Sequence, residues 1–215
     1  KFIVTEEDGL SSVLEVREES QIESIALSED TKVGSKLLTL KAIDADADSK
    51  IVYKLLDSAQ ASYFYLNSST GELWLARSID RESVDLVEIL VFANDGHFEA
   101  HKLLRFMIED VNDNAPRFVN FTLSEITVSE DAEVGTVILS LFAIDPDLGA
   151  NGQFKFELTH LSNEANKRKL FAIVGNTLLV AGQLDFETEP EHYLNISAVD
   201  TFGLRSEIKV FKVIL

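Results

Sequence analysis

Apolar and polar residues alternate along most of the chain. Leu38, Leu40 and Ala42 share one side of residues 37–43, and Leu194 and Ile196 share one side of residues 193–198. A period of two is typical of β-strands with one buried face. Each half of the chain carries about seven such runs, separated by turn-forming residues, and the pattern therefore predicts an all-β protein.

The chain also repeats itself. Residues 25–30 (IALSED) recur as residues 126–131 (ITVSED), an offset of 126 − 25 = 101 residues, and the two copies are separated by a turn-rich stretch, residues 110–116 (DVNDNAP). We therefore expect two domains, residues 1–115 with an N-terminal extension and residues 116–215. Each is predicted to be a seven-stranded, antiparallel, Greek-key sandwich of the immunoglobulin-like kind.

Composition narrows the class of protein. The 215 residues include 19 Lys and Arg against 37 Asp and Glu, a net charge of −18, which argues against a nucleic-acid partner. The chain has no cysteine, so disulfides and thiolate metal sites are excluded. It starts at Lys1 and has no apolar run long enough to span a membrane, and we expect it to be a piece of a longer protein.

Acidic residues recur at the predicted strand ends of both units. Strand ends meet at the poles of a sandwich, so the acids should gather around the linker, with Arg81 as the one basic residue among them. The eight carboxylates expected there are Glu29, Asp80, Glu82, Asp110, Asp113, Asp145, Asp147 and Asp200.

So many carboxylates repel one another unless a cation joins them. A donor set of oxygens without His or Cys favours calcium over magnesium. A solvated acidic hinge without any ion is the alternative. Asp80 and Glu82 could also be the paired carboxylates of a glycosidase. Since they are only two residues apart in a crowded acidic region, we interpret them as metal ligands and expect no enzyme and no small-molecule substrate.

Three motifs resemble the signatures of cadherin extracellular repeats: residues 80–82 (DRE), 110–116 (DVNDNAP) and 143–152 (AIDPDLGANG). The resemblance covers residues 22–215 and implies two tandem repeats of an atypical or protocadherin-like ectodomain. It also implies about three calcium ions at the junction. Their implied ligands are Glu29, Asp80, Glu82 and Asp113 for the first ion, Glu29, Glu82, Asp110, Asp113, Asp147 and the Val111 carbonyl for the second, and Asn112, Asp145, Asp147, Asp200 and the carbonyls of Asn114 and Asn151 for the third.

Two further sets of acids are half-sites that need neighbouring repeats. Asp44, Asp46 and Asp95 are expected at the upstream end, and Glu130, Asp185 and Glu187 at the downstream end.

The resemblance implies calcium-dependent cell–cell adhesion at the cell surface. The partner would be the same or another cadherin, and the membrane anchor would lie outside this stretch. In the alternative interpretation the two repeats form a rigid spacer that transmits force or distance and touches no partner.

Other residues are candidates for modification or contact. Asn67, Asn120 and Asn195 begin N-glycan acceptor sequences. Trp74, the sole tryptophan, is out of phase with Leu73 and Leu75, so it should face outward as a contact residue.

Overall fold

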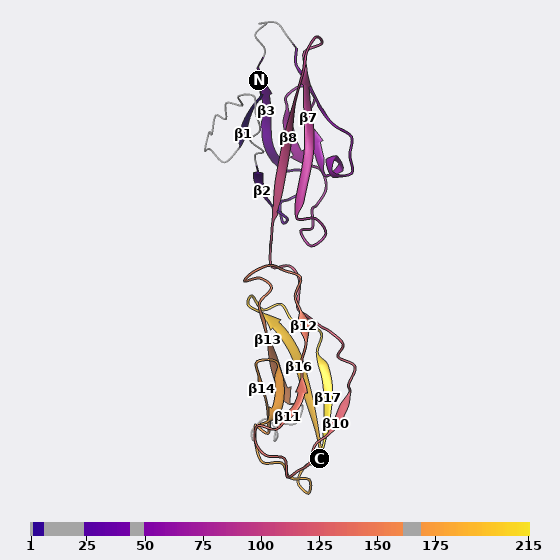
Figure 1. Cartoon of the computed structure of the whole chain (residues 1–215), viewed down its shortest axis with the longest axis vertical. Helices are drawn as coiled ribbons and strands as arrows, with labels where there is room; N and C mark the ends of the chain where they lie inside the picture. Colours follow the sequence, from indigo (N-terminus) through magenta and orange to yellow (C-terminus); the bar gives the residue numbers. More distant parts are fainter. Residues whose placement is uncertain (1, 7–23, 44–49, 161–168) are drawn as a thin grey trace. The chain divides into compact units, whose positions relative to one another are not determined.

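The computed structural model describes residues 2–6, 24–43, 50–160 and 169–215. The chain divides into two compact units, Lys1–Val111 and Asn112–Leu215. Figure 1 shows strands in both, and the one described helical segment is a 3₁₀ turn, Gln60–Tyr63.

The first unit consists of two four-stranded sheets. One sheet has the order β1-β3-β6-β5, formed by Phe2–Glu6, Lys36–Ala42, Glu72–Leu75 and Phe64–Leu66. The other has the order β2-β8-β7-β4, formed by Ser24–Ser28, Glu99–Glu109, Leu86–Asn94 and Val52–Leu55.

The second unit repeats this plan, with the second strand interrupted. One sheet has the order β10-β17-β16-β13, formed by Glu125–Thr127, Lys209–Ile214, Glu191–Asp200 and Phe154–His160. The other side holds β11-β15-β14, formed by Val137–Ser140, Thr177–Val180 and Phe171–Val174, and the short pair β9 (Arg117–Phe118) and β12 (Ala143–Ile144).

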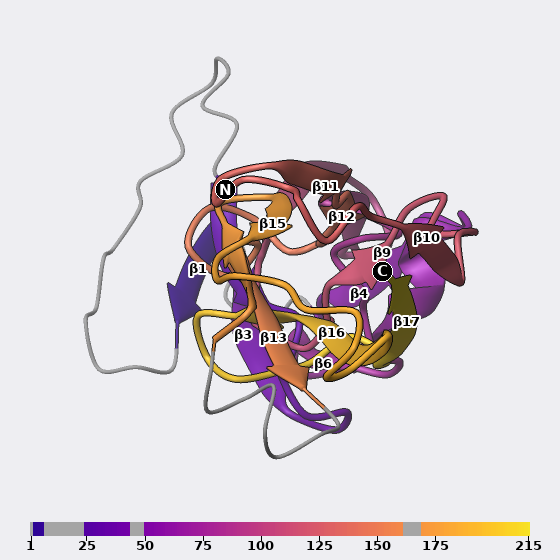
Figure 2. The ribbon, with the colours of Figure 1, turned by 90° about the horizontal axis from the view of Figure 1, so that it is seen from below.

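Each unit is a seven-stranded sandwich, as the sequence predicts, with its first strand split into two segments. In the first unit β1 pairs antiparallel with β3, and β2 pairs with β8 in the opposite sheet. In the second unit β9 pairs with β12, and β10 pairs with β17, its neighbour in Figure 2. The second strand of that unit is itself interrupted between β11 and β12.

The expectation of purely antiparallel sheets is wrong at one place in each sandwich, because β2–β8 and β10–β17 run parallel. The first strand leaves one sheet and joins the other. There its neighbour is the last strand of the sandwich, which runs in the same direction. Alternation along a single strand carries no information about this crossing.

The period-two pattern places the cores correctly. Leu38 and Leu40 are buried in the first unit, and Leu194 and Ile196 are fully buried in the second. Aromatic packing supplements the aliphatic core, as in the stacked rings of Phe64 and Phe106, whose centroids are 4.8 Å apart. Each sandwich therefore has its own core and can hold strand ends in fixed positions.

His192 is an ionisable residue in the core of the second unit. It lies on β16 with 2% of its surface exposed, its ring packs edge-on against Phe171, and its Nδ1 is 3.6 Å from a carboxylate oxygen of Glu189. Burial lowers the pKa of His192, and the charge of Glu189 opposes this shift only partly. The folded unit therefore holds the imidazole in its neutral form.

The second unit should lose stability as the pH falls. Because the folded pKa lies below the unfolded value of about 6.5, the stabilising contribution is complete above pH 6.5 and is lost as the pH falls through the folded pKa. The loss is roughly 1.4 kcal/mol for each pH unit between the two values. We expect the unfolding temperature of the second unit to decrease as the pH is lowered from 7.5 to 5.5. The measurement follows the methyl signals of Ile196 in the presence of chelator.

The His192→Phe variant keeps an aromatic ring against Phe171 and should remove most of this dependence. An equally steep fall in the variant would contradict the assignment to His192.

Candidate metal centre

Glu29 organises the lower end of the first sandwich. Glu29 directly follows β2 in the chain, and 8% of its surface is exposed. One carboxylate oxygen accepts a hydrogen bond from the backbone N–H of Arg81 (2.8 Å), and the other accepts one from the N–H of Val111 (2.8 Å). Glu29 thus joins three segments that are far apart in the sequence: the end of β2, the β6–β7 connection and the end of β8.

This arrangement brings three carboxylates together. Oxygens of Glu29, Glu82 and Asp110 all lie within 4.8 Å of one another, close enough to coordinate one metal ion. Burial raises the pKa of Glu82, and the nearby charge of Glu29 adds to the shift. The repulsion expected from the sequence is therefore present within the first unit.

Arg81 partly neutralises the cluster. Its guanidinium forms ion pairs with Glu82 and Asp110, and 9% of its side chain is exposed. Burial disfavours the charged guanidinium, but the hydrogen bond to Glu82 and the charge of Asp110 outweigh it and raise the pKa of Arg81. One fixed positive charge therefore faces three carboxylates, which leaves the cluster net negative.

Asp80 stabilises the turn that carries this motif. Its carboxylate accepts hydrogen bonds from the hydroxyl of Ser83 (2.8 Å) and the N–H of Glu82 (3.1 Å). The Ser83 hydrogen bond is the main reason that the pKa of Asp80 is lowered. Asp80 lies outside the cluster of three carboxylates and is more exposed.

Asp200 and the linker residue Asn112 belong to a second group of oxygen donors, which lies in the second unit. Asp200 ends β16, is 4% exposed, and accepts hydrogen bonds from the N–H groups of Phe202 (2.8 Å) and Leu204 (2.9 Å). The Nδ2 of Asn112 donates to the other carboxylate oxygen at 2.8 Å. Burial alone would raise the pKa of Asp200, but these hydrogen bonds outweigh it and lower the pKa.

Asp147 is held by the linker and by a tight turn. The side-chain amide of Asn114 donates to its carboxylate at 2.8 Å, and its own N–H donates to Asp145 at 3.1 Å. A β-carbon added to Gly152 would lie 2.2 Å from the carbonyl oxygen of Asp147. Only glycine fits there, so the motif of residues 143–152 requires Gly152 to position Asp145 and Asp147.

The donor set fits a hard cation. Within the described residues, Oδ1 of Asn112 is buried and accepts no hydrogen bond, although Nδ2 of the same amide donates to Asp200. A buried carbonyl oxygen without a donor is costly, and a metal ion would satisfy it. Carboxylate, amide and backbone oxygens are the donors that calcium takes.

The same geometry recurs at the outer poles of the two units. Glu130 accepts the N–H of Phe186 at 2.9 Å, as Glu29 accepts that of Arg81, and Asp185 accepts the N–H of Thr188 at 3.2 Å. Asp95 accepts the N–H groups of His97 (2.7 Å) and Phe98 (2.6 Å), as Asp200 does in its own hairpin. Glu187 is exposed beside Asp185, whereas Asp44 and Asp46 lie outside the described residues.

The remaining candidates lie away from the acids. Trp74 points away from the buried Leu73 and Leu75 but is only half-exposed between Tyr65 and Lys36 of the adjacent strands. Among the three glycan acceptor residues, Asn120 is exposed and Asn67 and Asn195 are half-buried.

Comparison with known proteins identifies the class. The sequence profile of the cadherin domain matches residues 23–103 and 124–213, so the chain belongs to the cadherin family and carries two cadherin repeats. Cadherin-related family member 1 of Gallus gallus is 31% identical over 189 residues, which cover 87% of this chain and 22% of that protein. Human protocadherin-15 is 33% identical over 180 residues, which cover 82% of this chain and 9% of that protein.

Solved structures agree with this family. The crystal structure of human protocadherin-24 EC1-2 matches with a TM-score of 0.79 and 25% identity, covering 89% of this chain and 92% of that one. Mouse clustered PcdhgC3 EC1-3 matches with a TM-score of 0.76 and 29% identity, covering 91% of this chain and 66% of that one.

Membership of the cadherin family supports an extracellular role of the adhesion type. Cadherins are adhesion proteins and cadherin domains typically bind calcium. The chain spans about a fifth of the length of the Gallus gallus relative. Among the described residues, no helix has the length and apolarity needed to cross a membrane.

Glu29 should stabilise the first unit even without metal. In Glu29→Ala the N–H groups of Arg81 and Val111 lose their acceptor, which should cost about 1–3 kcal/mol of unfolding free energy. Glu29→Gln keeps an acceptor for one of these two N–H groups and removes a negative charge from the cluster, so it should cost less than Glu29→Ala. Denaturant unfolding in chelator, followed by Trp74 fluorescence, reports on the first unit; equal stability of the two variants would contradict this role.

Proposed function

We propose that calcium ions bind jointly to both groups of oxygen donors and stiffen the two repeats as part of an adhesion ectodomain. The first half-site comprises Glu29, Asp80, Glu82, Asp110 and Val111; the second comprises Asn112, Asp113, Asn114, Asp145, Asp147, Asn151 and Asp200. The observation that carries the proposal is the convergence of Glu29, Glu82 and Asp110 to within 4.8 Å beside the linker.

Charge is the first argument. The carboxylates of the first half-site exceed the single charge of Arg81, and burial together with the charge of Glu29 already raises the pKa of Glu82. Cations would relieve the repulsion within such a cluster at neutral pH. About three calcium ions would bring +6 to the eight carboxylates of the two half-sites.

Continuity of the chain is the second argument. Asp110 and Val111 belong to the first half-site, and the next three residues belong to the second, where Asn112 contacts Asp200 and Asn114 contacts Asp147. Because the linker passes directly from one set of donors to the other, ions bound by both sets would restrict bending of the chain. Without ions the linker would act as a hinge between like-charged groups.

Concentration is the third argument. Extracellular calcium modules commonly have dissociation constants of about 10⁻⁴–10⁻³ M, so such a junction is filled outside cells and empty inside them. The stiffening would therefore appear only where adhesion takes place.

The outer poles extend the same proposal. Glu130 accepts a backbone N–H as Glu29 does, Asp185 accepts within its own turn as Asp80 does, and Asp95 accepts hairpin N–H groups as Asp200 does. We propose that they, with Glu187, Asp44 and Asp46, bind calcium together with acids of adjacent repeats.

The proposed partner is the same or another cadherin, on an anchored parent protein at the cell surface. Trp74, beside Tyr65 on the outer surface of its sheet, is the proposed contact residue. The alternative, a spacer that transmits force without touching a partner, keeps the same calcium chemistry.

Asp200→Asn and Asp95→Asn form a matched pair of variants. In both, asparagine keeps an oxygen that can accept the backbone N–H groups of the hairpin and the charge is lost; Asp200→Asn also loses the oxygen that accepts Nδ2 of Asn112. Asp200→Asn should shift the calcium midpoint of stiffening, measured by small-angle X-ray scattering, about tenfold upward, equivalent to about 1.4 kcal/mol. Asp95→Asn should leave it unchanged, and equal shifts in the two variants would refute the shared site.

Sedimentation velocity separates adhesion from the spacer interpretation. In millimolar calcium, a dimer that dissociates in chelator would support a contact within residues 1–215, and Trp74→Ala should weaken it. A monomer whose frictional ratio merely rises with calcium would support the spacer.

A further inference from the structure

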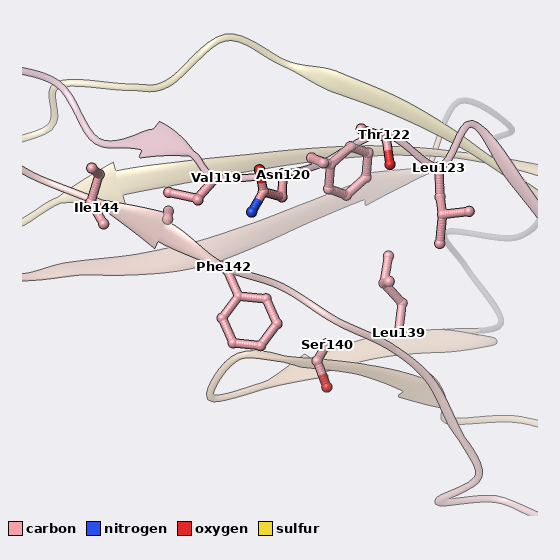
Figure 3. Close-up of a pocket in the computed structure, with 10 residues that line it drawn as sticks. Val119, Asn120, Thr122, Leu123, Leu139, Ser140, Phe142 and Ile144 are labelled. Atoms are coloured by element: carbon pink, nitrogen blue, oxygen red, sulfur yellow. The ribbon is translucent and has the colours of Figure 1, made fainter.

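An apolar groove lies on the surface of the second unit. Its volume is about 530 Å³, within the range of small-ligand sites, and it runs between residues 119–123 and residues 139–144 (Figure 3). Phe142 is 61% exposed, Leu123 51% and Ile144 46%. Exposed apolar patches of this kind often mark binding surfaces.

The groove arises from a break in the second strand of the unit. In the first unit β3 is continuous, and Lys41 occupies the place that corresponds to Phe142, since 142 − 101 = 41. In the second unit the strand is interrupted between β11 and β12, at Leu141 and Phe142. The second unit therefore has an exposed aromatic ring where the first unit has a solvated lysine. Core packing does not explain the ring, because Leu141 next to it is the residue that enters the core, with 1% of its surface exposed.

The glycan acceptor residue Asn120 is part of the groove wall. Asn120 is exposed, has a left-handed backbone (φ 54°), and follows Val119, whose N–H donates to the Phe142 carbonyl at 2.9 Å. Figure 3 shows its carboxamide turned toward the segment that carries Phe142. Asn67 accepts the N–H groups of Ser69 and Thr70 within its own turn, and a side-chain oxygen of Asn195 is buried on β16.

We propose that Asn120 is N-glycosylated and that the first sugar of its glycan lies in this groove, against Phe142 and Val119. The Nδ2 of Asn120 forms a bond to the anomeric carbon of N-acetylglucosamine, the bond from that carbon to a lipid-linked diphosphate breaks, and the amide proton is lost to a base. A pyranose ring has an apolar C–H face, which packs on the negative face of an aromatic ring. The groove is thus the surface that a covalently attached occupant covers.

A single sugar is enough to test this assignment. The full chain is secreted from cells that make only oligomannose glycans with ¹³C-labelled N-acetylglucosamine. Endoglycosidase H then leaves one sugar on each occupied asparagine, and peptide mapping gives the occupancy of Asn120. We expect Asn120 to be occupied and the acetyl methyl signal of its sugar to move upfield by the ring current of Phe142.

Two matched variants isolate the contact. Phe142→Ser should keep the sugar on Asn120 and abolish the upfield shift, whereas Phe98→Ser, at a ring that is 78% exposed in the first unit, should leave it unchanged. Complete removal of the glycan should raise the fluorescence of a bound apolar dye several-fold in the parent chain and little in Phe142→Ser. Removing the acceptor at Asn67 by Asn67→Gln should not raise it.

Three results would overturn the proposal. The first is an unmodified Asn120 in the secreted chain. The second is a sugar signal that is not shifted, or one that stays shifted in Phe142→Ser. The third is a glycosylated chain that dimerises and loses the dimer in Phe142→Ser, because a second copy would then be the occupant of the groove.

Discussion

Repulsion between carboxylates beside the linker is the constraint on which this protein depends. Folding two sandwiches brings strand ends together, and in the first unit it places Glu29, Glu82 and Asp110 within 4.8 Å of one another. Arg81 offsets part of that charge, and backbone N–H groups stabilise Glu29 directly. The proposed calcium ions would neutralise the remaining negative charge, and their binding would couple the sandwich fold to its ionic surroundings.

The two units meet this constraint with one repeated set of hydrogen bonds. In the first unit Glu29, which follows β2, accepts the backbone N–H of Arg81. In the second unit Glu130, which follows β10, accepts the backbone N–H of Phe186 in the same way. The exchange of Arg81 for Phe186 shows where the units differ. The first has a built-in positive charge among its acids, whereas Phe186 is 47% exposed and supplies none.

The sequence predicted the sandwiches, their cores and the acids at the strand ends, because alternation and repetition are local properties that the printed residues carry. It could not predict the parallel pairs β2–β8 and β10–β17, because the crossing of the first strand depends on which sheet offers a free edge. Nor could it show that Glu29 accepts the N–H of Val111, or that Oδ1 of Asn112 is buried without a donor among the residues that the structure describes, since both depend on folded geometry. Nor could it show the groove beside Phe142, because that groove depends on how residues 119–123 lie against the interrupted second strand.

The most direct test of the shared calcium site is a measurement of residual dipolar couplings for the two units in the same weakly aligned sample. If common ions join the half-sites, backbone couplings from both units should fit one alignment tensor in saturating calcium and two different tensors in chelator. Two independent tensors in saturating calcium, with both units folded and calcium bound, would contradict the account.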